Sequence, residues 1–134
     1  EKNDSTDDGH IGGDMSVDGT GNWTFPSTGI WQVTFNQSIA SLNHENPWPT
    51  TYIQTTVDNS SYTNTVYVSN SMYDAADAWQ YGQGTVTALI DVTSTTNVKV
   101  RLKVNNDGGS SSIQTQGSSV DNLTYATFVR LGDT

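Results

Sequence analysis

The chain of 134 residues contains no cysteine, so no disulfide framework can hold its fold together. Positive charge is also scarce, because five Lys and Arg residues stand against fourteen Asp and Glu, which gives a formal net charge of −9. Such an acidic chain argues against nucleic acid and anionic membrane surfaces as partners. No apolar run approaches the roughly 20 residues of a membrane span. We therefore expect neither nucleic-acid binding nor membrane insertion.

Most of the polarity comes from Ser, Thr, Asn and Gln, since charged residues make up only 14% of the chain and hydrophobic residues 33%. Thr is a good strand former while Lys and Glu are poorer ones, so this composition is typical of a β-sandwich surface. The length suits one domain that buries roughly two-thirds of its unfolded surface. Residues 1–14 are acidic and Gly-rich, which indicates an arm or linker before a domain at 15–134.

Alternation of apolar and polar residues predicts a series of short strands. Every second residue is apolar in segments 85–92 and 98–104. Residues 15–25 are expected to form a hairpin around the turn at 18–21. Further strands are expected at residues 30–39, 52–57, 62–68, 113–120 and 123–131.

We expect Trp31 in the core, and Ile53 and Val57 on the inward face of their strand. Residues 71–81 fit either a turn or two of helix or a long loop. Eight to ten short strands with turn signals between them, and no convincing long helix, indicate an antiparallel two-sheet sandwich or jelly roll. The predicted fold class is therefore all-β.

The last strand, at residues 123–131, is apolar on both faces, since Tyr125 and Val129 point one way and Phe128 the other. A strand covered on both sides is expected in the middle of a sheet, with a core on one face and a second contact on the other. Because this strand closes the chain, another copy of the chain is the contact we expect.

Two stretches resemble a known family. Residues 23–31, with the sequence WTFPSTGIW, are similar to the entry to the long second-strand region of the complement globular-head and tumour-necrosis-factor-like jelly rolls. Residues 124–131, TYATFVRL, resemble the closing strand of that superfamily, although Thr127 stands where the family usually has Gly. The version most like this chain, over residues 15–134, is found at the ends of phage structural proteins, which carry runs similar to residues 25–31, 91–97 and 128–134. We therefore expect the C-terminal module of a longer protein.

The resemblance implies a compact homotrimer in which the inner sheet, including the closing strand, faces the threefold axis. The residues that it places at the trimer interface are Tyr125, Thr127, Phe128, Val129 and Arg130. It also implies a location in the virion, an extracellular particle, with other virion proteins as partners. The first hypothesis is a distal tail-fibre or appendage module that contacts the host surface. The alternatives are a capsid decoration or cement protein and a monomeric carbohydrate-binding module.

Aromatic residues in or beside loops are candidate ligand-binding residues, because apolar C–H faces of sugars stack on such rings. These residues are Trp48, Tyr52, Tyr73, Trp79 and Tyr81. The alternative is that the rings plug the ends of the sandwich or pack at the trimer interface. A host surface glycan is the ligand that this interpretation implies.

Three basic residues, Lys99, Arg101 and Lys103, share one face of the predicted strand at 98–104. This stripe fits a solvated face that discourages edge-to-edge pairing, ion pairs with a neighbouring subunit, or an anionic glycan.

Catalysis and metal binding have little support. The pairs Asp74 with Asp77 and Asp107 with Asp121 offer oxygen ligands for Ca²⁺, but no EF-hand pattern is present. His44 lacks the second His of a zinc helix motif, and no nucleophile elbow occurs. We expect a non-enzymatic domain without metal or cofactor.

Overall fold

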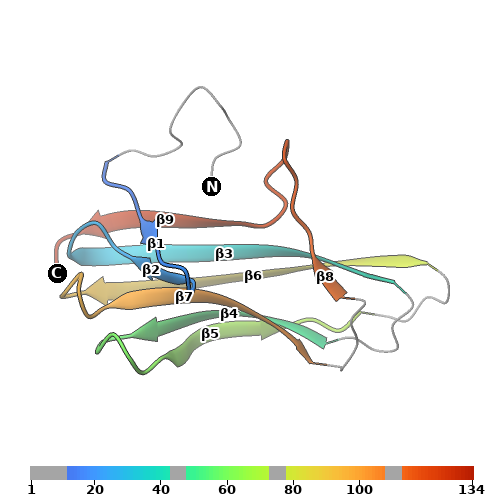
Figure 1. Ribbon diagram of the computed structural model, residues 1–134, viewed down its shortest axis with the longest axis horizontal. Helices are drawn as coiled ribbons and strands as arrows, with labels where there is room; N and C mark the ends of the chain where they lie inside the picture. The colour runs from blue at the N-terminus through green and yellow to red at the C-terminus, as the bar shows by residue number, and fades with distance from the viewer. Residues whose placement is uncertain (1–11, 43–47, 73–77, 108–112) are drawn as a thin grey trace.

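A computed structural model describes residues 12–42, 48–72, 78–107 and 113–134. These residues form nine strands and no helix, which confirms the all-β prediction (Figure 1). The strands are β1 (Ser16–Val17), β2 (Asn22–Thr24), β3 (Gly29–Leu42), β4 (Trp48–Thr56), β5 (Thr63–Ser69), β6 (Trp79–Val92), β7 (Lys99–Asp107), β8 (Ile113–Thr115) and β9 (Tyr125–Gly132). Accordingly, this part of the chain contains no helical segment able to cross a bilayer.

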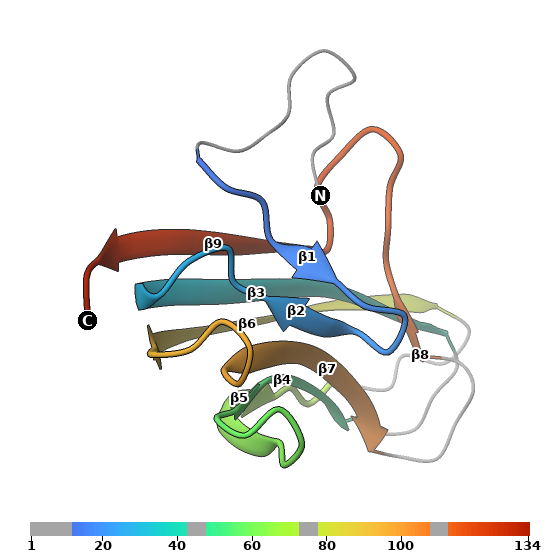
Figure 2. The same ribbon diagram turned by 60° about the vertical axis from the view of Figure 1, so that its left-hand side comes forward.

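The strands form two antiparallel sheets. The first sheet has the order β1-β2-β7-β4-β5. In the second sheet β3 pairs with β6 along one edge and with both β9 and β8 along the other. Figures 1 and 2 show β9, β3 and β6 side by side in one layer, with β7, β4 and β5 in the other.

The long strands β3 and β6 extend further than the sequence predicted. They pair over their whole length, from Gly29 with Val92 to Leu42 with Trp79. β6 begins at Trp79, and the ambiguous segment before it lies partly in residues 73–77, outside the described part of the chain. The predicted strand at 113–120 is reduced to β8.

The core lies between the two sheets and follows the predicted alternation. Trp31 is buried, as are the inward residues of β6 and the start of β7. The buried apolar cluster consists of Phe25, Trp31, Val33, Phe35, Ile53, Val86, Ala88, Ile90, Val92, Val98 and Val100. Trp23 and Phe128 pack against this cluster from the side, with their ring centroids 5.3 Å apart.

The inward position predicted for Val57 is wrong, because this side chain is 76% exposed. Ile53 is buried within β4, as predicted, but β4 ends at Thr56, so Val57 no longer belongs to the strand. It lies in the bend that follows, where Asp58 accepts hydrogen bonds from the backbone of Ser60 and Ser61. Because Val57 has left the regular strand, the period of two no longer predicts its burial.

The two stretches that carry the family resemblance contact each other. Gly29 has a φ of 135°, a conformation that favours glycine. A Cβ at this position would overlap the carbonyl oxygen of Gly132 and the side chain of Arg130. The Arg130 Nε donates a hydrogen bond to the carbonyl oxygen of Thr28 at 3.0 Å. The start of β3 and the end of β9 are therefore fitted to each other at this corner.

The closing strand β9 differs from prediction in one respect. Among the described strands it pairs with β3 alone, so it is not in the middle of the sheet. Apolar residues on both faces of a strand predict contacts above and below the sheet, but they do not specify how many strands lie beside it.

Candidate assembly face on the β6-β3-β9 sheet

The outward face of the second sheet is built from three rows of side chains in register. The rows are Leu89-Gln32-Val129, Thr87-Thr34-Thr127 and Thr85-Asn36-Tyr125 on β6, β3 and β9 respectively. We call these nine residues the assembly face. None of them is charged, and the next outward position on β6, Asp91, carries the nearest charge along that strand.

Apolar side chains lie bare on this face. Val129 is 47% exposed and Leu89 is 65% exposed, one on each side of Gln32. Leu131, beyond Val129 at the end of β9, is 55% exposed. A surface depleted of charge and carrying bare aliphatic groups is typical of the centre of a protein interface.

The polar groups of the face are held in place by bonds between neighbouring strands. Thr34 and Thr87 share a hydrogen bond of 2.9 Å between their hydroxyls. Asn36 is buried, and its Oδ1 accepts hydrogen bonds from Gln83 and Thr85 on β6. Its Nδ2 donates to the carbonyl oxygen of Leu123, just before β9. Asn36 thus fixes the approach of the closing strand to β3.

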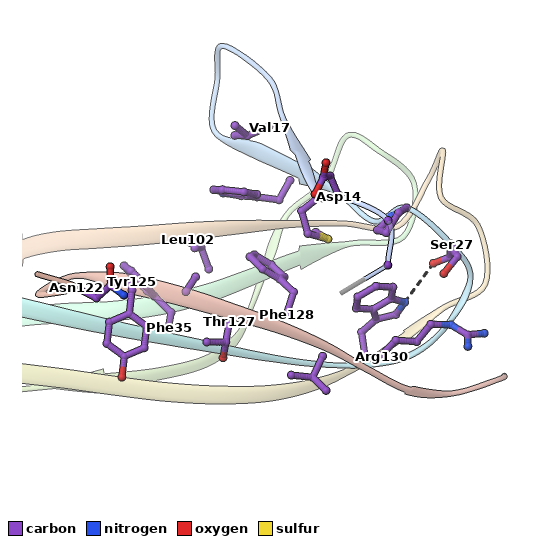
Figure 3. A pocket seen from close by; sticks show the side chains of 18 of the residues that line it. Asp14, Val17, Ser27, Phe35, Leu102, Asn122, Tyr125, Thr127, Phe128 and Arg130 are labelled. Carbon is purple, nitrogen blue, oxygen red and sulfur yellow. Dashed lines mark hydrogen bonds between the residues drawn. The ribbon is translucent and has the colours of Figure 1, made fainter. Parts of the chain in front are cut away.

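A groove of about 1400 Å³ lies on the other side of β9. Its walls include the hairpin residues Met15, Val17 and Trp23 together with Leu102 and Phe128. Figure 3 shows Phe128 pointing toward Leu102, while Tyr125 lies on the opposite side of the strand. Both faces of β9 are therefore apolar, as the sequence indicated, and the groove leaves part of the inward face open.

The predicted interface residues divide between these two faces. Tyr125, Thr127 and Val129 lie together on the assembly face. Phe128 packs inward against Trp23 and Phe25. The guanidinium of Arg130 binds within its own chain, to Thr28 and to the carboxylate of Asp133.

The predicted ligand-binding aromatics also do not form one site. Trp79 and Tyr81 are exposed on β6 at the far end from Leu89. Tyr52 lies on β4, in the first sheet, and Trp48 is exposed at the start of that strand. Tyr73 lies outside the described residues. A sequence gives no sign of this division, because it depends on which strand joins which sheet.

Two exposed aspartates have a lowered pKa, and both hold turns. Hydrogen bonds from the backbone and side chain of Asn22, and from Thr20, lower the pKa of Asp18 below its ordinary 3.8. Hydrogen bonds from Ser61, Thr56 and Ser60 do the same for the pKa of Asp58. These shifts are explained by turn structure.

No group of three or more metal-ligating side chains is found within the described ranges. Of the carboxylates considered for calcium, Asp121 is exposed. Asp74 and Asp77 lie outside the described residues, and Asp107 belongs to β7 by its backbone pairing with Trp48.

No family model and no curated protein matches this chain. Among solved structures, the chain is similar to the Eiger TNF of S. frugiperda, with a TM-score of 0.62 and 16% sequence identity. The match covers 90% of this chain and 70% of that chain. At this identity the likeness concerns the fold alone. The two antiparallel sheets and the likeness to this structure together show that the fold is a TNF-like jelly roll.

Proposed function

We propose that this chain is a non-enzymatic domain that assembles as a homotrimer through the β6-β3-β9 sheet. The observation that carries the proposal is the uncharged assembly face, on which Leu89 and Val129 lie exposed beside Gln32. Elsewhere the chain is strongly acidic, with a net charge of −9, so three copies brought together would repel one another. A contact surface free of carboxylates is what such an assembly requires.

The satisfied polar groups of the face also favour assembly. Burying a hydroxyl or amide in an interface costs free energy unless it keeps a hydrogen bond. Thr34 and Thr87 are already bonded to each other, and Asn36 has partners for both its oxygen and its nitrogen. These groups enter an interface with hydrogen bonds that their own chain supplies.

We further propose that the domain is the distal module of a phage tail fibre or related appendage, and that it contacts the host surface. The support is the resemblance of residues 25–31, 91–97 and 128–134 to the phage version of this jelly roll. In this arrangement the assembly face joins the subunits, and the opposite sheet remains available for an external ligand.

The assembly proposal is tested by Val129→Asp, which puts a carboxylate within the proposed contact, at one of its exposed aliphatic residues. Sedimentation velocity should show a trimer for the unmodified chain and smaller species for the variant. The matched control is Val57→Asp, which adds the same charge at an exposed residue directly after β4 of the other sheet and should remain trimeric. Dissociation of both variants, or of neither, would contradict an interface at Val129.

The virion proposal is tested by electron microscopy of particles that carry the parent protein, decorated with antibody against this domain. Label at the tip of an appendage is the expected result. Label spread evenly over the shell would instead identify a decoration protein, and absence of label from particles would overturn a virion role.

A further inference from the structure

The outward face of the first sheet carries a basic stripe, formed by Lys99, Arg101 and Lys103 on β7. These are three of the five basic residues of the chain. They alternate with the buried Val98 and Val100, so their side chains point away from the core. Successive residues of the stripe are about 7 Å apart along the strand.

Two ordinary explanations of the stripe do not fit the fold. Basic residues protect the free edge of a sheet, but β7 lies in the interior of its sheet, between β2 and β4. Ion pairs with a neighbouring subunit across the assembly face do not explain the stripe either, because β7 belongs to the opposite layer (Figure 1). No ion pair between described residues involves Lys99, Arg101 or Lys103.

Tyrosine rings lie directly beside this stripe. Lys103, Tyr52 and Tyr67 are cross-strand partners in one row over β7, β4 and β5. The Lys103 ammonium is 5.2 Å from the centre of the Tyr52 ring. The rings of Tyr52 and Tyr67 are 5.6 Å apart at an angle of 31°, and Tyr67 is 61% exposed. The row thus presents a cation next to the half-buried ring of Tyr52 and the exposed ring of Tyr67.

The neighbouring row adds a guanidinium and side-chain amides. Arg101 is paired with Asn22 on one side and Gln54 on the other. Its Nε donates to the Asn22 Oδ1 at 2.8 Å, and its guanidinium lies 3.8 Å above the centre of the Tyr62 ring. The terminal nitrogens of Arg101 have no hydrogen-bond partner among the described residues. Arg101 is therefore held in position while its terminal N–H groups stay free to bind an anion.

We propose that this face binds a saccharide that carries anionic groups, either carboxylate or sulfate. Sugar rings offer apolar C–H surfaces for Tyr52 and Tyr67, hydroxyls for side-chain amides such as that of Gln54, and acidic groups for Lys103 and Arg101. The inference rests on the proposed host-surface role, for which it names the ligand class, but it does not depend on trimerisation.

The test is isothermal titration of the full chain with polysialic acid, heparin and dextran at low and physiological salt. Polysialic acid carries carboxylates, heparin carries sulfates as well, and dextran is neutral. We expect binding of at least one acidic polymer that weakens with salt, and none of dextran. Equal binding of dextran would overturn the requirement for charge. Single-stranded DNA is titrated as a control polyanion, and equal binding of this DNA would overturn the choice of a saccharide.

Two pairs of variants locate the site. Tyr52→Ala should weaken binding by about tenfold, the effect of one lost ring stack, whereas Tyr52→Phe keeps the ring and should bind nearly as well. Lys103→Gln should reduce both the affinity and its salt dependence, while Lys103→Arg should retain both. Thermal melting confirms that each variant is folded.

Light scattering on the same samples separates this inference from the assembly proposal. A trimer that binds none of the three polymers contradicts the saccharide site and leaves the assembly face intact. A monomer that binds an acidic polymer contradicts the assembly and leaves the saccharide site intact.

Discussion

Replacing Gly84 with alanine should destabilise the fold strongly, because β6 passes close to the opposite sheet at this residue. Gly84 is buried, and a Cβ there would overlap the hydroxyl of Thr51 on β4. That hydroxyl donates a hydrogen bond of 2.5 Å to the Oε1 of Gln37, whose side chain is fully buried. The Gln37 Nε2 in turn donates to the Thr115 hydroxyl at 2.9 Å. An added methyl group therefore presses on a buried polar network rather than on a flexible apolar chain.

The cost has two parts. Overpacking a dense core costs about 1–3 kcal/mol, and a buried amide oxygen that loses its donor costs about 1–3 kcal/mol more. We expect a loss of about 2–6 kcal/mol in the free energy of unfolding. For a chain of this length each kcal/mol lowers the melting temperature by about 4 °C, so the expected decrease is about 8–24 °C.

The matched control is Gly82→Ala, two residues away on the same inward face of β6. A Cβ there would lie 3.4 Å from the Sδ of Met72, a flexible side chain that can adjust. We expect a change below about 1 kcal/mol. Calorimetry of both variants at one chain concentration makes the comparison, because the stability of an oligomer depends on concentration. Equal melting temperatures for the two variants would refute the reasoning about Thr51 and Gln37.

Two further predictions concern the groove and the first turn. Phe128→Ala should lower the free energy of unfolding by about 2 kcal/mol in urea, since its ring is only partly buried against Trp23, while Val57→Ala should change it by less than about 0.5 kcal/mol. The lowered pKa of Asp18 means that its charge stabilises the fold above its ordinary pKa of 3.8, and this stabilisation is lost as the pH falls through the folded pKa. The melting temperature of Asp18→Asn should therefore fall less than that of the unmodified chain as the pH is lowered below about 4. Identical curves of melting temperature against pH would contradict this role of Asp18.

The alternation of apolar and polar residues along the chain predicted much of the fold. In β6 the inward residues Val86, Ala88, Ile90 and Val92 are all buried, because both long strands keep an unbroken period of two. The same rule failed at Val57, because β4 ends at Thr56 and the residue types do not mark where the strand stops. The period of two therefore predicts burial only within the regular strand.

The candidate sites were less predictable, because both depend on strands that are far apart in the sequence. The sequence identified Tyr52 and Lys103 separately, but only the pairing of β4 with β7 places one beside the other. The sequence does not identify Tyr67 as a binding residue, since nothing in its own segment indicates that it lies opposite Tyr52. The apolar character of Val129 was visible, whereas its position across from Leu89 and Gln32 required the order of the second sheet.

The assembly of the unmodified chain is the central claim, and its mass in solution tests that claim most directly. Sedimentation equilibrium over a wide range of dilute concentrations should give three times the mass of one chain, because the bare aliphatic groups of Leu89 and Val129 would then be covered. A single-chain mass that persists at the highest concentration would contradict the account.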